Sequence, residues 1–191
     1  MDVVSQAAPR PAREPISGVV EADETIIPFR TKNDPIVRPA GRSGVGQMLV
    51  AGAVEIDGGK PRRARLTVIE GFGKQELHAF VLGAVAPQTR LVTDDWPSYQ
   101  DLPSVRHNAM TLGPMAAHIA LPWIHRLFSN LKRWGLGVYH GLRKTNLQHY
   151  LDEFVFRFNR RRTRHAAFDT LLGIGARTTP VPYRVLICKT A

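Results

Sequence analysis

The stretch GVVEADETII, residues 18–27, places three acidic side chains inside a run that is otherwise rich in β-branched residues. This composition predicts a β-strand, because Val, Ile and Thr favour an extended backbone. Side chains alternate along a strand, so Glu21, Asp23 and Thr25 share one face and Glu24 lies on the other. An acid in the middle of an apolar strand is unfavourable unless it is paired or bound to a cation. The strand therefore marks both a sheet and a candidate site.

Four more runs have the composition of strands: QMLVAGAVEI (47–56), RRARLTVIE (62–70), RLVT (90–93) and, as a candidate, RHNAMTL (106–112). Asp57-Gly58-Gly59 predicts a hairpin between the first two of these runs. Residues 30–46 contain two Pro and several Gly, which predicts an exposed loop.

Four runs have helical spacing: KQELHAFVLGAV (74–85), WIHRLFSNLKRWGL (123–136), NLQHYLDEFVFRFNRR (146–161) and AAFDTLLGIG (166–175). Pro122 suits the first turn of the second helix, which is expected to end at Gly137. The last helix is expected to close the fold. Strands followed by helices in this order predict an α/β fold with one mixed sheet of about five strands, flanking helices and a helical C-terminal part.

Composition excludes several classes of protein. The 191 residues are 43% hydrophobic, which argues against disorder, and no apolar run approaches the ~20 residues of a membrane span. The N-terminus lacks the apolar segment of a secretory signal. Cys188 is the only cysteine, so a disulfide framework or a four-cysteine zinc site within the chain is excluded.

The charge points to a polyanionic partner. Twenty-six Lys and Arg against sixteen Asp and Glu give a net charge of +10, and no acid occurs from Leu102 to Leu151. A long stretch of one sign suggests a surface that faces phosphates, and the alternative is a solvated basic face.

Asp94 directly follows the predicted strand 90–93, and ligands bind at the carboxyl ends of strands in open sheets. If that strand neighbours the first one, Asp23 and Asp94 meet, as two-metal phosphodiester chemistry requires. The alternative is that Asp94-Asp95 caps a helix.

Five motifs in order resemble the DDE-type transposases of ISXO-like bacterial insertion sequences: VEADET, VAGAVE, LVTDDWPSY, LFSNLKRWGLGVYHGL and LQHYLDEFVFRFNRR. The resemblance covers residues 18–172. It implies a ribonuclease H-like catalytic domain, here residues 18–176, preceded by a flexible tail or module remnant (1–17) and followed by an extension (177–191). It also implies two Mg²⁺ or Mn²⁺ ions that promote DNA cleavage and strand transfer.

Carried over by position, the family's metal ligands are Asp23, Asp94 and His125, the last standing where a Glu is usual. This third position is found by counting seven residues back from Lys132. A spacing of seven places His125 and Lys132 on the same face of the helix, and Lys132 is expected to contact a DNA phosphate there. Neutral imidazole suits softer ions than magnesium and brings no charge, so the site is manganese-tolerant, weakened or inactive. The second hypothesis is accordingly a catalytically impaired, non-specific DNA-binding remnant.

The basic runs supply the candidates for further DNA contacts, although such residues are often only solvated: Lys132, Arg133, Arg143, Arg157, Arg160, Arg161 and Arg162. The expected partners are insertion-sequence ends and target DNA, with a homodimer or higher oligomer, no membrane, and a cytoplasmic, nucleoid-associated location. Relatives usually carry an upstream zinc ribbon and a helical DNA-binding segment. Since neither fits in residues 1–17, we expect DNA to be bound chiefly through its phosphates.

Overall fold

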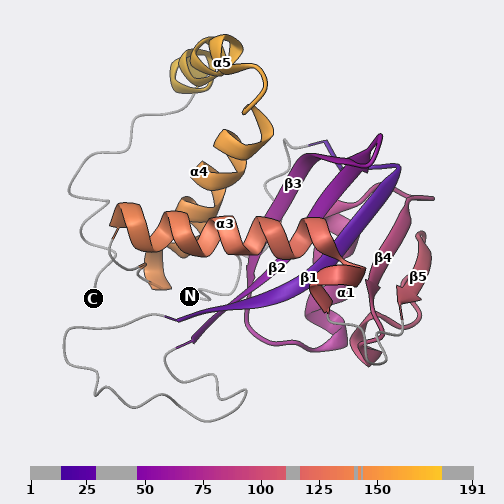
Figure 1. Cartoon of the computed structure of the whole chain (residues 1–191). Helices are drawn as coiled ribbons and strands as arrows, with labels where there is room; N and C mark the ends of the chain where they lie inside the picture. The colour runs from indigo at the N-terminus through magenta and orange to yellow at the C-terminus, as the bar shows by residue number, and fades with distance from the viewer. Residues whose placement is uncertain (1–13, 29–46, 111–116, 140–141, 143, 178–191) are drawn as a thin grey trace, which may run out of the picture.

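The computed structural model describes residues 14–28, 47–110, 117–139, 142 and 144–177. Its centre is one five-stranded sheet (Figure 1), made of β1 (Val19–Pro28), β2 (Gln47–Asp57), β3 (Lys60–Ile69), β4 (Arg90–Asp94) and β5 (Arg106–Met110). The strand order is β3-β2-β1-β4-β5. β1, β2 and β3 pair antiparallel, whereas β4 and β5 continue the sheet parallel to β1. The predicted mixed sheet, including the candidate fifth strand, is confirmed.

The helical elements are α1 (Lys74–Ala84), η2 (Pro97–Tyr99), α2 (Ala117–Ala120), α3 (Pro122–Tyr139), η3 (Lys144–Asn146), α4 (Leu147–Asn159) and α5 (Arg164–Arg177). One hydrophobic core joins the sheet to α3 and α4, and it includes Val50, Leu127 and Leu151. A second core lies on the opposite face, where α1 and η2 pack through Leu77 and Tyr99. The described chain is therefore a sheet with a layer of helices on each face.

Alternation along β1 supplies both layers. Val20 and Ala22 are fully buried in the core beneath α1, while Ile27 belongs to the core beneath α3 and α4. The acids of the first strand therefore lie in a strand that is covered on both sides, which is why Glu21 and Asp23 are themselves buried.

The β2–β3 hairpin turns at Gly58 and Gly59, whose φ angles are +56° and +70°. Two consecutive positive φ values are typical of the type I′ turn, and glycine adopts them without steric cost. The predicted hairpin is confirmed. The predicted loop at 30–46 lies outside the described residues.

Helix α4 covers the exposed edge of β3 with polar side chains. Asn159 accepts a bond from the Ala64 N–H at 2.7 Å and donates to the Ala64 carbonyl at 3.2 Å. Gln148 does the same for the Val68 N–H at 3.0 Å and the Leu66 carbonyl at 3.3 Å. Unpaired edge strands invite aggregation, so these amide groups substitute for a sixth strand. They explain two polar residues of the motif LQHYLDEFVFRFNRR.

Helix α3 is longer than the sequence predicted. It continues through Gly137 to Tyr139, so the expected end at Gly137 is wrong. The Tyr139 ring packs edge-on against Trp134 at 5.2 Å, and its hydroxyl donates to Glu153 of α4 at 2.6 Å. These tertiary contacts hold the last turn in a helical conformation despite the low helix propensity of glycine.

Helix α5 exists as predicted but does not close the fold. Phe168, Leu171, Leu172 and Ile174 are each about half exposed or more. In Figure 1 the helix stands apart from the layers around the sheet. Hydrophobic spacing predicted the helix correctly but gave no information about its packing partner.

Residues 14–17 of the expected N-terminal tail are packed against the fold. Ile16 is fully buried and pairs through its backbone with Ala84 and Ala86, at 2.9 and 2.8 Å.

In the described part of the chain, no helix is both long enough and apolar enough to span a bilayer.

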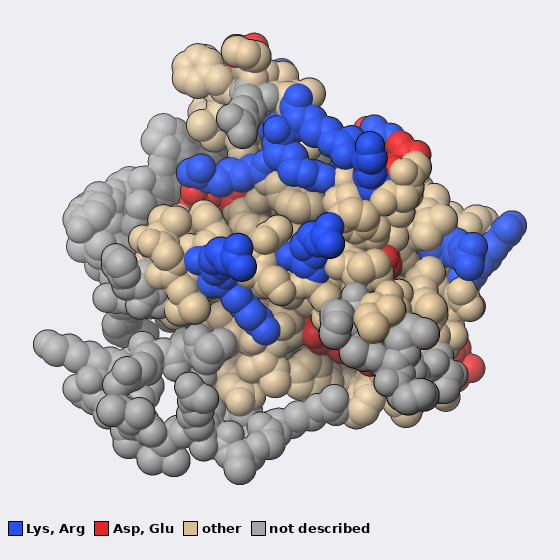
Figure 2. Space-filling model, viewed as in Figure 1, with Lys and Arg blue, Asp and Glu red and all other residues tan. Residues whose placement is uncertain are grey.

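Basic side chains gather on the face formed by α3 and α4 (Figure 2). Arg126 and Arg133 are exposed on α3, and Arg157 and Arg162 are exposed at and beyond the end of α4. Within the described part of the run without acids between Leu102 and Leu151, Arg126 and Arg133 are thus exposed, while apolar residues such as Leu127 and Leu131 belong to the core.

Candidate active site

The sheet register brings the two aspartates to the same level. β1 and β4 pair in parallel from Val19↔Arg90 to Glu21↔Val92. Two residues further along each strand stand Asp23, in the middle of β1, and Asp94, at the end of β4. The predicted meeting of these two acids across neighbouring strands is thus what the topology produces.

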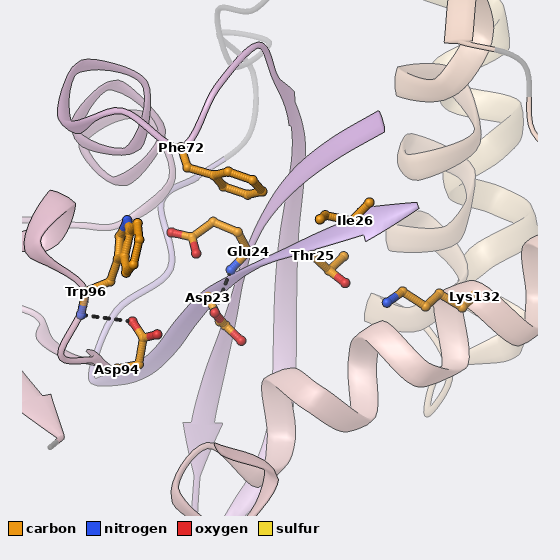
Figure 3. A pocket seen from close by; sticks show the side chains of 8 residues that line it. All are labelled: Asp23, Glu24, Thr25, Ile26, Phe72, Asp94, Trp96 and Lys132. Carbon is orange, nitrogen blue, oxygen red and sulfur yellow. Dashed lines mark hydrogen bonds between the residues drawn. The ribbon is translucent and has the colours of Figure 1, made fainter. Parts of the chain in front are cut away.

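Both carboxylates line one pocket of about 330 Å³, together with Glu24, Thr25, Ile26, Phe72, Trp96 and Lys132 (Figure 3). The Asp94 carboxylate accepts a bond from the backbone N–H of Trp96 at 3.3 Å. Asp94 therefore also stabilises the turn that leads into η2, which is close to the capping role considered as the alternative. The Asp94 side chain therefore both accepts this bond and lines the pocket.

Helix α3 brings the third predicted residue to the first. The His125 Nε2 atom lies 3.5 Å from the Asp23 carboxylate, and the His125 side chain is 28% exposed. Lys132, two turns further along the helix, lines the pocket and its charge lowers the pKa of Asp23. The sequence prediction that His125 and Lys132 share one helix face is consistent with both contacts.

Asp23 is in an unusual electrostatic environment. Burial, together with the negative charges of Glu24 and Asp94, raises the pKa of its carboxyl to about 7. The hydrogen bond from the Glu24 N–H and the charge of Lys132 lower this pKa only in part. A carboxylate in this position lacks sufficient positive charge nearby. A bound cation would supply that charge, so the environment suits a metal ligand.

The donor set also fits a divalent ion. Carboxylate oxygens bind Mg²⁺ and Mn²⁺, and an imidazole nitrogen shifts the preference toward Mn²⁺ and softer ions. Within the residues that the structure describes, however, no three His, Cys, Asp or Glu side chains stand close enough together to hold an ion. Metal binding by Asp23, Asp94 and His125 therefore stays a prediction.

The sequence did not single out Glu21 as a site residue, yet its side chain joins β1 to α3 through two hydrogen bonds. Its carboxylate accepts bonds from the backbone N–H groups of Trp123 at 2.8 Å and Ile124 at 2.9 Å. Burial raises the pKa of Glu21 although both bonds lower it. In the sequence, only the alternation of side chains along the strand indicated this role, because it places Glu21 on the same face as Asp23.

The sequence also did not predict that two aromatic residues line the pocket. Phe72, three residues after the end of β3, and Trp96, two residues after Asp94, stand beside Glu24 in Figure 3. Close by, burial and the charge of Glu24 raise the pKa of the Tyr99 hydroxyl well above its ordinary value. Trp96 lies within the motif LVTDDWPSY, but nothing in the sequence connects Phe72 to this site.

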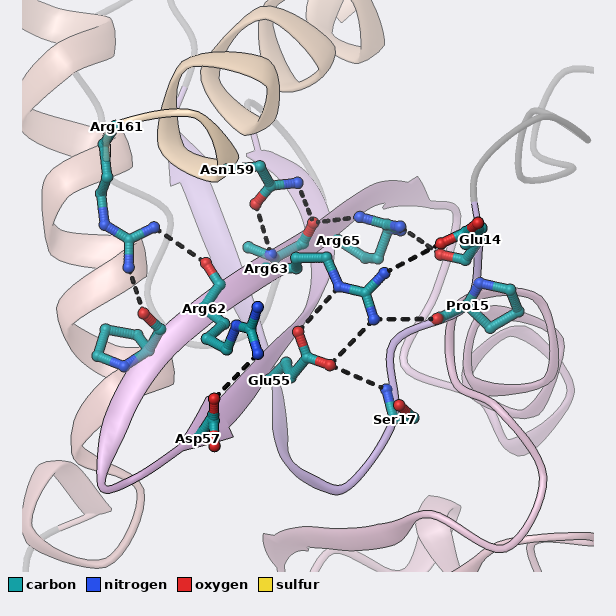
Figure 4. A network of polar contacts seen from close by, with 12 residues as sticks. Glu14, Pro15, Ser17, Glu55, Asp57, Arg62, Arg63, Arg65, Asn159 and Arg161 are labelled. Carbon is teal, nitrogen blue, oxygen red and sulfur yellow. Dashed lines mark hydrogen bonds and ion pairs between the residues drawn. The ribbon is translucent and has the colours of Figure 1, made fainter. Parts of the chain in front are cut away.

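The arginines predicted to contact DNA have very different surroundings. Arg161 has a structural role in part, because its guanidinium donates to the carbonyls of Arg62 at 2.9 Å (Figure 4), Phe158 at 2.6 Å and Pro61. It also lies 3.9 Å over the Phe158 ring. Burial lowers the pKa of Arg161.

The remaining basic candidates are more open. Arg157 forms an ion pair with Glu153 at 2.8 Å, and Arg160 lies 4.2 Å over the ring of Phe156. Two more are exposed to solvent: Arg133 and Arg162. Arg143 lies outside the described residues. A DNA contact by any of these residues stays a prediction.

The comparison with solved structures found chains that align with about three quarters of this one. One is a chain of the cryo-EM structure of the simian T-cell lymphotropic virus intasome in complex with the PP2A regulatory subunit B56 gamma, with a TM-score of 0.50 and 14% identity over 75% of this chain and 48% of that one. Another is the Mos1 strand transfer complex, with a TM-score of 0.32 and 15% identity over 76% of this chain and 53% of that one. This chain spans about half the length of either protein.

The comparison with curated proteins gave no match. The family model of the ISXO2-like transposase domain, in contrast, matches residues 15–159, from the buried Ile16 segment to the last residue of α4. That range contains the whole sheet and all four residues predicted to form the site. The predicted ribonuclease H-like fold is confirmed, and the chain belongs to the ISXO2-like transposase domain family.

Proposed function

We propose that this chain is a transposase catalytic domain that cuts DNA and transfers strands with two divalent ions held by Asp23, Asp94 and His125. The observation that carries the proposal is the convergence of three distant segments. Asp23 of β1 lies 3.5 Å from His125 of α3, and it shares a pocket with Asp94 of β4.

Ions bound there would activate the attacking hydroxyl group and stabilise the leaving oxygen of a phosphodiester. The chain's own residues prepare the place. Asp23 and Asp94 supply carboxylates from two neighbouring strands of a rigid sheet, and the Trp96 N–H orients the Asp94 carboxylate. Lys132 projects into the same pocket, where its ammonium group suits a phosphate oxygen.

DNA is the proposed substrate. The cationic face and the pocket share helix α3, on which the exposed Arg133 directly follows the pocket residue Lys132. Since the contacts would be to phosphates, binding should have little sequence preference and should weaken steeply with salt.

A supercoiled-plasmid nicking assay in Mn²⁺ tests the proposal. Wild type should nick, and Asp23→Asn and Asp94→Asn should each lose the activity. Asp95→Asn is the matched control, because Asp95 is the exposed neighbour of Asp94 and does not line the pocket. Equal nicking by all four proteins, or by none of them, contradicts the catalytic proposal.

A second candidate function is a DNA-binding remnant without catalysis, and His125 favours it because an imidazole brings no negative charge to the metals. In that case gel shifts should weaken with salt while no variant nicks. His125→Glu separates the two candidates: if the substitution restores Mg²⁺-dependent nicking to an inactive protein, the histidine is the lesion. If wild type instead nicks in Mn²⁺ and His125→Ala abolishes this activity, the result supports His125 as a metal ligand.

A further inference from the structure

We propose that Glu21 is a positioning residue: from the central strand it holds the first turn of α3, and thereby keeps His125 beside Asp23. This inference rests on the proposed function, because it concerns the geometry of the same site. It assigns a role to an acid that does not itself line the pocket.

The contact is buried and specific. Glu21 is 4% exposed, and one of its carboxylate oxygens accepts both N–H bonds, from Trp123 and Ile124. The partners are 102 and 103 residues away along the chain, so the contact joins two elements that the sequence keeps apart. Each is a charge-assisted hydrogen bond inside the protein, where such bonds are strong.

Among the described residues, only Glu21 accepts hydrogen bonds from the Trp123 and Ile124 N–H groups in the first turn of α3. The first N–H groups of any helix lack partners within it, and a polar side chain at the preceding position usually accepts their bonds. Here the preceding residue is Leu121, which is apolar and fully buried, and Pro122 has no N–H. Ile124 is fully buried too, so water cannot replace the lost acceptor.

A cap from β1 has a consequence that a local cap would not. Glu21 and Asp23 stand two residues apart on one face of the strand, while Ile124 and His125 are neighbours on the helix. Two contacts, Glu21 to Ile124 at 2.9 Å and Asp23 to His125 at 3.5 Å, therefore fix both the distance and the rotation of the helix start. The favourable placement of a carboxylate at a helix N-terminus supports the same arrangement.

The experiment uses Mn²⁺ alone as the probe and the intact chain in every arm. Free Mn²⁺ is measured by electron paramagnetic resonance for wild type, Glu21→Ala, Glu21→Gln and Asp23→Asn. Loss of an outer-shell partner typically weakens metal affinity 10- to 100-fold, so we expect about a tenfold loss for Glu21→Ala. Glu21→Gln keeps an acceptor oxygen and should bind nearly as well as wild type.

Hydrogen–deuterium exchange supplies a readout that does not depend on metal. A peptide spanning residues 121–128 should exchange faster in Glu21→Ala, and near the wild-type rate in Glu21→Gln. The matched control is Glu55→Ala, which removes another buried strand acid, on β2, that contacts Arg63 instead of α3. This control should leave both Mn²⁺ affinity and exchange in 121–128 unchanged.

A double variant tests whether Glu21 acts through the helix. In a His125→Ala background, Glu21→Ala should cause little further loss of Mn²⁺ affinity. Unchanged affinity or unchanged exchange in the Glu21→Ala single variant overturns the proposal, as does an undiminished loss in the double variant. If wild type shows no Asp23-dependent Mn²⁺ binding at all, the proposed function itself fails, which distinguishes the two results.

Discussion

Replacing Gly52 by Ala should force α3 away from the sheet. Gly52 lies in β2 directly opposite Asp23 in the register, and the Phe128 ring of α3 lies on it. A Cβ atom at Gly52 would stand 2.6 Å from Cε1 and 2.8 Å from Cζ of Phe128, and 3.0 Å from Cδ2 of Leu66. The absence of a side chain at this position therefore allows the close approach between helix and sheet.

The size of the effect follows from these distances. Carbon atoms in contact rest about 3.5–4.0 Å apart, so the Phe128 ring must retreat by about 1 Å. The ring cannot turn aside freely, because Phe128 is 4% exposed and Leu66 is 3% exposed in the same core. Overpacking of this kind typically costs 1–3 kcal/mol, and we expect Gly52→Ala to lower the free energy of unfolding by about 2 kcal/mol.

Urea unfolding followed by tryptophan fluorescence measures this loss. Gly137→Ala is the matched control, since a Cβ at that position of α3 meets nothing within 4 Å. The control should be neutral or stabilising by up to about 1 kcal/mol, because alanine favours the helix. Phe128→Leu in the Gly52→Ala protein should recover part of the loss, since the smaller side chain removes the clash.

The reasoning is refuted if Gly52→Ala is as stable as wild type. It is also refuted if the effects of Gly52→Ala and Phe128→Leu simply add. Residues in contact show coupling of about 0.5–3 kcal/mol in a double-mutant cycle, and a coupling near zero means that the ring is not what the new methyl group meets.

Three further predictions concern stability. Arg161→Ala should lower the free energy of unfolding in urea by about 1–3 kcal/mol, because three backbone carbonyls lose their donor. The control is Arg162→Ala at the exposed neighbouring residue, which should change this free energy by less than about 0.5 kcal/mol, and equal losses contradict the structural role of Arg161. Arg63 holds the pKa of Glu55 below its ordinary value of 4.5, so the stability this carboxylate contributes is present above that pH and is lost as the pH falls below it. Thermal melts of wild type and Glu55→Gln should thus differ at pH 7 and converge near pH 3, and parallel curves over that range are the contrary result. Tyr139→Phe should lower stability by about 1 kcal/mol, because it removes the 2.6 Å hydroxyl bond to the Glu153 carboxylate of α4; no change in the urea midpoint argues against that bond.

Much of the architecture could be predicted from local pattern. Alternation identified β1 and placed Asp23 on one face with Glu21, and helical spacing identified all four buried residues of α1: Leu77, Phe80, Val81 and Ala84. The position of Asp94 at a strand end predicted its place at the edge of the sheet. These predictions succeed because side-chain periodicity is a property of the local backbone.

Other features depended on contacts that local pattern does not contain. Gly137 favours the end of a helix, yet α3 continues because Tyr139 reaches α4. Arg161 belongs to a basic run that suggests DNA contact, yet its donors meet backbone carbonyls of the β2–β3 hairpin. In both cases a partner about fourteen to a hundred residues away determines the outcome.

The amino-acid sequence by itself determined the order of strands and helices, the cationic character of the C-terminal half and the residue types available to a metal site. Only the tertiary structure decided that His125 approaches Asp23, that Glu21 receives the start of α3, and that Gly52 must remain without a side chain. The physical reason is that periodicity fixes the face on which a side chain lies, whereas the distance between two elements depends on how their packed surfaces fit together.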